Sequence, residues 1–139
     1  MIFFHYGTVV DNLDTAMSQM SKALGIGWRP ITESEMMPVW SATGAEHWSV
    51  RRAWSFDGPP YIELIDDCSG LTDEGGPLGR HHIGYWSEDV RADGARLEAA
   101  GCRRMLADPS GQGYAVYRSP AGVYLELITA MARDVVLNT

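Results

Sequence analysis

Apolar side chains recur at helical spacing in two stretches of the chain. In the first stretch these positions are Leu13, Ala16, Met17, Met20 and Leu24. In the second they are Val90, Ala95, Leu97 and Ala100. Asp11 or Asn12 precedes the first stretch and Asp89 precedes the second, where an N-cap side chain is favoured. We therefore expect two helices, ending near Gly25 and Gly101.

Six further stretches are rich in Val, Ile, Tyr and Trp and are bounded by Gly, Pro and Asp, a pattern that is typical of β-strands. They cover residues 26–32, 48–56, 61–66, 102–107, 114–118 and 123–129. The segment 36–46 is either an additional strand or a loop over the functional site. Strand boundaries read in this way shift by a few residues.

The chain contains an internal repeat. His5-Tyr6-Gly7 recurs as His82-Ile83-Gly84, and the segment 61–65 (YIELI) recurs as 124–128 (YLELI). Each half therefore begins with His, continues into a helix, ends with Glu and is predicted to be β-α-β-β-β. A module of about 60 residues has difficulty burying a sufficient core alone. We expect one domain, 1–139, with module one at about 1–68, a linker at about 69–79, module two at about 80–130 and a tail at 131–139.

Composition narrows the classes of partner. A net charge of −7 and a pI near 4.9 disfavour binding to nucleic acid or to anionic membranes, which require clustered Lys and Arg. The start of the chain lacks a basic leader, and no run of about 18 apolar residues occurs. Cys68 and Cys102 form no CxxC pair, so reduced thiols are expected. These features indicate a cytoplasmic protein that acts on a small molecule.

The repeated His and Glu residues are candidate metal ligands. Because side chains alternate along a strand, Glu63 and Glu126 each share a sheet face with large apolar neighbours. A carboxylate on such a face is costly unless a cation, a proton or a donor accompanies it. His5 and His82 are placed in the same way at the equivalent positions of the two halves. Two imidazoles and two carboxylates that converge would bind a divalent ion.

These residues resemble the vicinal oxygen chelate superfamily, which includes glyoxalase I, methylmalonyl-CoA epimerase, extradiol dioxygenases and bleomycin-resistance proteins. The resemblance covers about residues 2 to 130. It is carried by the His-x-Gly strands, the helix entry 10–16 (VDNLDTA) and the segment 119–122 (SPAG) before the last Glu-bearing strand. It implies an α+β protein in which paired βαβββ modules form a curved mixed sheet with a cleft, the glyoxalase-like fold.

The resemblance also implies a metal-ligand set. The family's ligand positions fall on His5, Glu63, His82 and Glu126, so all four are filled. Drug-binding members of the superfamily generally lack this set. A fourth protein ligand also occupies a position that a ring-cleaving dioxygenase leaves open for its substrate or dioxygen. The ion is a divalent metal, and the residue types do not distinguish nickel, cobalt, manganese, zinc and iron.

The ligand pattern is most similar to those of glyoxalase I and methylmalonyl-CoA epimerase. It implies a metal-dependent isomerase, epimerase or lyase that transfers a proton next to a carbonyl through a metal-bound enolate. By this resemblance Glu126 is the catalytic base and Glu63 is the candidate for the opposite face of the substrate. The alternative is a non-catalytic small-molecule or antibiotic-binding resistance protein. An extradiol-type dioxygenase is a third, less favoured hypothesis.

Large aromatic residues suggest the nature of the substrate. The candidates for the pocket are Trp40, Trp48, Trp54, Trp86 and Tyr114, with Arg51, Arg52 and Arg118 as possible anion-binding groups. Val9 and Asp67 replace residues that contact glutathione or favour its binding in glyoxalase I. We therefore expect an aromatic, polycyclic or otherwise hydrophobic substrate, or an acyl thioester. A homodimer is expected by analogy with the family.

Overall fold

The computed structural model describes residues 1–42, 44–68 and 78–138, without the side chains of 34–40, 44–49, 67 and 68. The first half contains β1 (Ile2–Val9), α1 (Leu13–Leu24), β2 (Thr32–Ser41), β3 (Gly44–Trp54) and β4 (Tyr61–Cys68). The second half contains β5 (His81–Ser87), α2 (Val90–Ala99), β6 (Arg103–Ala107), β7 (Tyr114–Arg118) and β8 (Tyr124–Thr129). A 3-10 turn, η2 (Ala130–Ala132), and a short helix, α3 (Arg133–Val136), follow. Both halves are β-α-β-β-β, as the repeat predicts.

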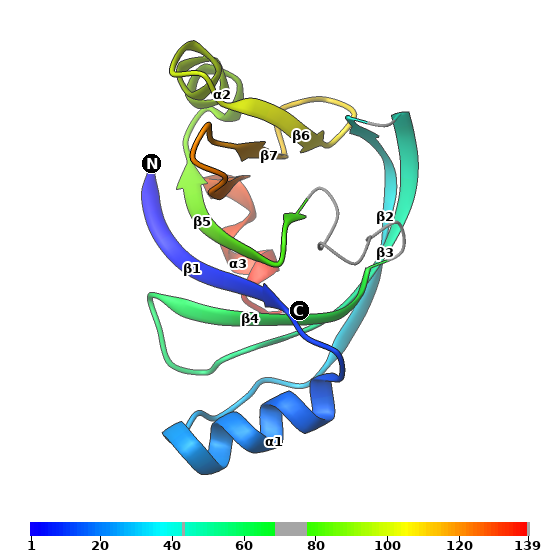
Figure 1. Ribbon diagram of the computed structural model, residues 1–139, viewed down its shortest axis with the longest axis vertical. Coiled ribbons are helices and arrows are strands. Elements are labelled where there is room, and N and C mark those ends of the chain that lie inside the picture. The colour runs from blue at the N-terminus through cyan, green and yellow to red at the C-terminus, as the bar shows by residue number, and fades with distance from the viewer. Residues whose placement is uncertain (43, 69–77, 139) are drawn as a thin grey trace.

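The strands form one mixed sheet that curves into a ring. The order around the ring is β1-β4-β3-β2-β6-β7-β8-β5, with β1 parallel to β4, β5 parallel to β8, and β1 antiparallel to β5. Only two residue pairs, Trp40 with Ala107 and Ser41 with Leu106, join β2 to β6. Figure 1 shows α1 and α2 outside this ring, at opposite ends of the view. The predicted glyoxalase-like fold is confirmed, and its sheet closes on itself.

Both long helices begin at the predicted residues. Asn12 and Asp89 are the N-caps, and their side-chain oxygens accept hydrogen bonds of 2.9 Å from the backbone N–H groups of Thr15 and Ala92. α1 ends at Gly25, whose φ of 70° lies in the left-handed region that favours glycine. Local capping interactions that can be predicted from the sequence thus determine where these helices begin and where α1 ends.

The strands bury apolar side chains on both faces of the sheet. Outside the ring, Leu13 of α1 packs with Ala53 and Leu64, and Val90 of α2 packs in a cluster with Tyr117 and Leu127. The opposite face carries two further clusters. One contains Val50, Ile65, Leu78, Leu106 and Val116, and the other contains Phe4, Trp54 and Trp86. The ring interior is therefore mainly apolar, which makes any charged group there costly.

The predicted strand at 26–32 is wrong. β2 begins only at Thr32, and the preceding segment forms a single isolated bridge between Trp28 and Ser55. Its apolar residues instead pack on the first helix, where Trp28 Nε1 donates to the Met17 carbonyl over 3.1 Å. Glycine and proline interrupt this connecting segment, so it forms no continuous ladder. The segment 36–46, expected to be an additional strand or a loop, is mostly strand: residues 36–41 end β2 and residues 44–46 begin β3.

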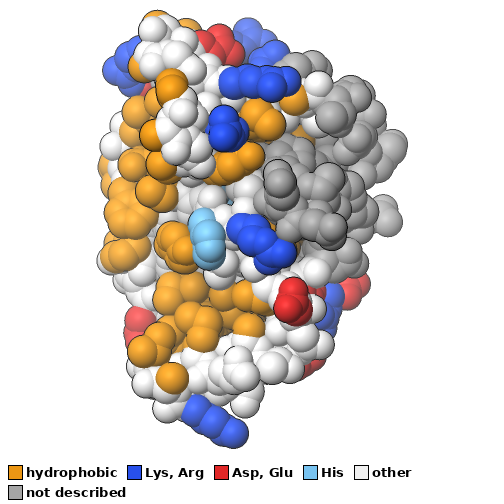
Figure 2. Space-filling view, viewed as in Figure 1, with side chains coloured by type: hydrophobic (Ala, Val, Ile, Leu, Met, Phe, Trp, Pro, Cys, Tyr) orange, Lys and Arg blue, Asp and Glu red, His pale blue; other side chains and the backbone are white. Residues whose placement is uncertain are grey.

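No helix among the described residues is long and apolar enough to span a membrane. Figure 2 shows apolar side chains on one face of the molecule, interspersed with basic and acidic ones. The exposed apolar side chains on β1 are those of Ile2, Phe3 and Tyr6. The described surface therefore combines scattered charges with an apolar strip along β1.

Candidate metal centre

The two His-x-Gly segments pair with each other across β1 and β5. In this antiparallel ladder His5 lies opposite Gly84, and Gly7 lies opposite His82. A Cβ atom added to Gly84 would lie 1.9 Å from the His5 ring, and one added to Gly7 would lie 2.0 Å from the His82 ring. Each glycine therefore leaves the space that the opposite imidazole fills. The ring centroids of the two histidines are 5.0 Å apart.

The parallel neighbours of these strands supply the two carboxylates. β4 lies beside β1 with Glu63 level with Gly7, and β8 lies beside β5 with Glu126 level with Gly84. Each Glu thus stands next to a glycine on the strand that it accompanies. The symmetry of the repeat brings two imidazoles and two carboxylates together at the centre of the sheet.

Four side chains converge at short distances. His5 Nε2 lies 3.0 Å from His82 Nε2 and 3.1 Å from Glu126 Oε2. His82 Nε2 lies 3.2 Å from Glu126 Oε2 and 3.3 Å from Glu63 Oε1, and Glu63 Oε1 is 3.8 Å from His5 Nε2. Both imidazoles and Glu63 are almost fully buried, and the Glu126 side chain is 15% exposed. We call these four residues the His/Glu quartet.

Packing orients the imidazoles. The Nδ1 atoms of both rings are buried and make no hydrogen bond to the described residues. The His5 ring instead stands edge-on to Phe4 and Trp54, with centroid distances of 4.3 and 5.0 Å. Its Nε2 atom is thereby directed toward the carboxylates, which is the orientation that a ligand requires.

In the absence of an ion, hydrogen bonds among the quartet side chains shift the pKa values of three of them. Burial lowers the pKa of His82, but hydrogen bonds to Glu126 and Glu63 outweigh burial and raise that pKa to about 10. Burial raises the pKa of Glu126, yet hydrogen bonds from His5 and His82 bring it below its usual range. Burial acts on Glu63 in the same way, and His82, Arg52 and His5 lower its pKa. Without metal, His82 therefore carries a proton at neutral pH.

The donor set fits a divalent metal ion. The four ligand atoms lie within 4.8 Å of one another. Ligands at about 2 Å from a common ion are separated by about 3 to 4 Å, which matches most of the measured distances. Two carboxylates balance a dication, and imidazole with carboxylate suits zinc, iron, nickel, cobalt and manganese. The quartet could therefore hold such an ion, and His82 would lose its proton when the ion binds.

Sequence comparison identifies the family of the chain. The family model described as the glyoxalase/bleomycin resistance protein/dioxygenase superfamily matches residues 4–118. The chain belongs to this superfamily. No curated protein sequence matches it.

Solved structures of superfamily members share the fold. One is a methylmalonyl-CoA epimerase in complex with methylmalonyl-CoA and NH4+, with a TM-score of 0.62 and 20% identity over 94% of this chain and 95% of that one. A variant of the Streptomyces coelicolor epimerase with 2-nitronate-propionyl-CoA has a TM-score of 0.61 and 20% identity, covering 93% and 96%. The Mycobacterium tuberculosis epimerase has a TM-score of 0.58 and 16% identity, covering 96% and 91%. At these identities the likeness concerns the fold.

A cavity of about 220 Å³ opens beside the quartet. Glu63, His82 and Glu126 lie in its wall, together with one cationic group among the described lining residues, Arg52. Arg52 Nη1 lies 3.2 Å from Glu63 Oε2, the oxygen that faces away from the histidines. The remaining lining is mostly apolar and consists of Val50, Ile65, Leu78, Leu106, Gly113, Tyr114, Ile128, Thr129, Ala132 and Val136.

The predicted pocket residues divide into three groups. Tyr114 lines the cavity. Trp54 and Trp86 are instead buried in the cluster with Phe4, and Arg118 is exposed at the end of β7, so none of the three is among the described lining residues. The side chains of Trp40 and Trp48 fall outside the described residues. Trp54 and Trp86 thus belong to the apolar cluster beside the quartet and not to the described cavity wall.

Sequence reasoning left several cavity residues unassigned. Ile65 and Ile128 lie two positions after the quartet carboxylates, and strand alternation does place them on the same face. Arg52 was one of three arginine candidates, and only the folded register selects it. Ala132 and Val136 carry no signal in the sequence because they follow the repeat in a segment without a predicted element. They come to the site because η2 and α3, which follow β8, pack beside the cavity.

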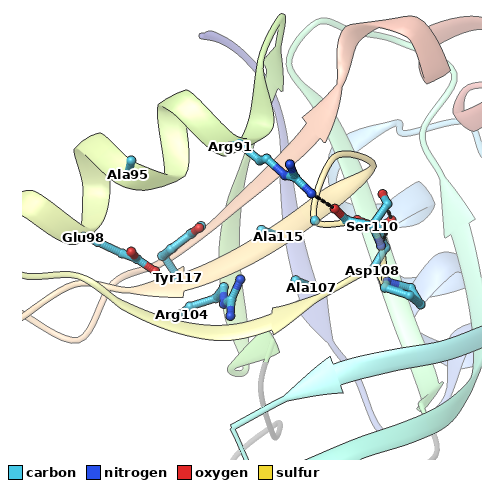
Figure 3. A pocket seen from close by; sticks show the side chains of 11 residues that line it. Arg91, Ala95, Glu98, Arg104, Ala107, Asp108, Ser110, Ala115 and Tyr117 are labelled. Carbon is cyan, nitrogen blue, oxygen red and sulfur yellow. Dashed lines mark hydrogen bonds between the residues drawn. The ribbon is translucent and has the colours of Figure 1, made fainter.

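A second hollow is separate from the quartet. It lies on the outside of the sheet, between α2 and strands β6 and β7, with a volume of about 360 Å³ (Figure 3). Arg91, Glu98 and Arg104 border it, and Ala107 and Ala115 form its floor. It contains no member of the quartet. Among the described lining residues, the quartet side chains therefore belong to the interior cavity and not to this outer hollow.

Proposed function

We propose that the chain is a metal-dependent enzyme that transfers a proton at a carbon next to a carbonyl group. The reaction is an isomerisation, an epimerisation or a lyase reaction on a hydrophobic or acyl-thioester substrate. The observation that carries the proposal is the quartet itself, four convergent ligand atoms beside an apolar cavity. Membership of the superfamily and the fold shared with methylmalonyl-CoA epimerases support the same chemistry.

Each quartet residue has a distinct role in the proposal. His5, His82, Glu63 and Glu126 would hold a divalent ion, which supplies Lewis-acid stabilisation of the negative charge that develops on the substrate oxygen. Glu126 is the proposed base. It lies in the cavity wall and is partly exposed to the cavity, so its carboxylate can reach a substrate proton. Glu63 faces the cavity from the other module and is the candidate for the second face of the substrate.

Arg52 makes the two carboxylates unequal. It is ion-paired with Glu63, whereas Glu126 contacts the two histidines. A carboxylate held by a guanidinium stays ionised and loses rotational freedom. This contact favours Glu63 as the fixed ligand and Glu126 as the carboxylate that moves the proton.

The apolar character of the cavity supports a second candidate function. Most of the described lining residues other than the quartet are apolar, as expected of a small-molecule binding site. A binding or resistance protein would use this lining without chemistry. Ligand affinity that survives complete removal of metal would favour this alternative over the enzyme.

Exchange of substrate protons with solvent tests the enzymatic proposal. We expect the metal-loaded protein to catalyse deuterium incorporation next to the carbonyl of short acyl-CoA esters in D2O, as followed by NMR. Glu126→Gln should abolish this exchange while the protein remains folded. The control is Glu98→Gln on the outer hollow, which should exchange like the wild type. Exchange that persists in Glu126→Gln refutes the role of Glu126 as the base.

The proposal includes a homodimer. Ile2, Phe3 and Tyr6 leave an apolar strip on the outside of β1, where 59%, 45% and 39% of these residues' surfaces are exposed. Apolar surface of this kind is stabilised when a second copy covers it. Sedimentation analysis tests this assembly, and a monomer at micromolar concentration contradicts it.

A further inference from the structure

The last segment of the chain returns to the metal site. η2 and α3 follow β8, and Figure 1 shows α3 within the outline of the strand ring. Val136 and the following Leu137 pack against the cluster of Phe4, Trp54 and Trp86. The segment from Thr129 to Leu137, here called the C-terminal wall, thus packs one side against the interior cluster and leaves its other side exposed.

Two further contacts hold the C-terminal wall in place. The Arg29 guanidinium donates a hydrogen bond of 2.5 Å to the carbonyl of Leu137. The Arg133 guanidinium lies over the Trp86 ring, 5.4 Å from its centroid. Arg29 belongs to the segment between α1 and β2, and Trp86 belongs to β5. The wall is therefore tied to both modules.

The C-terminal wall contributes small side chains to the cavity. Ala132 and Val136 line it together with Glu63, Glu126 and Arg52. The volume of about 220 Å³ exceeds the ~150 Å³ that suffices for a benzene ring, and it is below the ~300 Å³ at which typical ligand sites begin. A single ring or a short branched chain fits such a space, and a polycyclic group does not.

We propose that Ala132 and Val136 set the size limit for the apolar group that a substrate places beside the quartet. The substrate class is then carbonyl compounds with a short branched or single-ring substituent, including acyl thioesters with a small acyl group. The polycyclic substrates allowed by the sequence are excluded. This inference rests on the proposed function, because it assumes that the substrate carbonyl lies at the quartet.

A series of 2-oxo acids tests the size limit on metal-loaded protein. The probes are pyruvate, 3-methyl-2-oxobutanoate, phenylpyruvate and indole-3-pyruvate, which differ only in the apolar group, and affinity is measured by calorimetry. We expect the wild type to bind the first three and to bind the indole compound at least about tenfold more weakly than phenylpyruvate. Ala132→Phe should lose phenylpyruvate while retaining pyruvate, and Val136→Ala should bind the indole compound more tightly.

The matched control is Met131→Phe. Met131 belongs to the same turn but is 92% exposed, so the added ring stays in solvent and the affinity series should match the wild type. Metal content is measured in every sample. Wild-type protein that takes up no metal overturns the proposed function. Metal uptake with an affinity series that neither Ala132→Phe nor Val136→Ala changes overturns the size limit alone.

Discussion

At the residue scale, the site depends on glycines as much as on ligands. Gly7 and Gly84 have no Cβ atom, and each accommodates the imidazole of the opposite strand. The His-x-Gly repeat is thus one structural unit, in which the histidine of one strand requires the glycine of the other. This explains why the tripeptide, rather than the histidine alone, recurs in the two halves.

Replacing one of these glycines should disable the site. In Gly84→Ala the new methyl group would lie 1.9 Å from the His5 ring, so the ring must move away from the carboxylates. We expect loss of metal binding and a decrease in unfolding free energy of about 1 to 3 kcal/mol, typical of overpacking. Gly27→Ala is the control, because its nearest neighbour is the Phe56 ring at 3.3 Å. Full metal occupancy in Gly84→Ala contradicts the packing argument.

Arg52 should govern how the site loses metal in acid. The guanidinium contributes to the lowered pKa of Glu63, although burial opposes it, so Arg52→Gln raises this pKa. Protonated Glu63 is a poor ligand, and metal release should therefore begin at higher pH in the variant than in the wild type. Elemental analysis after dialysis across a pH series measures the midpoint.

The adjacent arginine provides the matched control. Arg51 pairs with Asp66 over 2.6 Å, and Asp66 also accepts the backbone N–H of Leu13 at the start of α1. Arg51→Gln should lower the melting temperature and leave the acid midpoint unchanged. Equal midpoints for Arg52→Gln and the wild type would show that Arg52 does not act on Glu63.

Alkaline pH should destabilise the protein only when the metal is absent. The pKa of His82 rises from 6.5 to about 10 on folding, so its contribution is fully present below about pH 6.5 and is lost as pH rises toward 10. The lowered pKa values of Glu63 and Glu126 add stability above about pH 4.5 that is lost in acid. Chelator-treated protein should therefore become easier to unfold in urea between pH 7 and 10.

The alkaline loss is specific to the metal-free state. Metal binding requires neutral His82, so the loaded protein has no proton to release from this residue as pH rises. Its urea midpoint should stay constant between pH 7 and 9. An alkaline decline of the same size in both forms would mean that the quartet proton is not its cause.

At the scale of elements, the sequence predicts the helices well because local interactions define them. Asn12, Asp89 and Gly25 are caps whose effect is confined to one turn. The strand expected at 26–32 is not formed, because the apolar residues of this segment pack on α1 and do not pair with a neighbouring strand. Composition does not reveal such a tertiary contact. The C-terminal wall is unpredictable for the same reason, since only tertiary packing on the cluster of Phe4, Trp54 and Trp86 brings Val136 to the cavity.

The N-cap of α1 offers a test confined to one element. Asn12→Ala removes the side-chain oxygen that accepts the Thr15 N–H, and we expect a loss of about 1 kcal/mol in unfolding free energy. Denaturant titration measures this loss. Metal content should not change, because α1 lies outside the ring and no residue of it belongs to the quartet. A stability equal to that of the wild type would show that the cap is dispensable.

At the scale of the molecule, the internal repeat allows the four quartet residues to be predicted from the sequence alone. Neither His5 nor Glu63 is informative alone, but the second module repeats both at equivalent positions. In the fold, β1 pairs in parallel with β4, and β5 pairs in parallel with β8. This pairing brings the four repeated side chains together. The cavity is less predictable because it combines residues of both modules and of the segment that follows them.

Metal stoichiometry shows whether the quartet is a metal centre. Protein purified without chelator is compared by elemental analysis with a His5→Ala, Glu126→Ala double variant, with circular dichroism confirming that both are folded. We expect about one equivalent of a divalent metal per wild-type chain and none in the folded double variant. A wild-type protein that neither contains nor takes up metal, or a double variant that retains it, contradicts the assignment of the quartet as a metal centre.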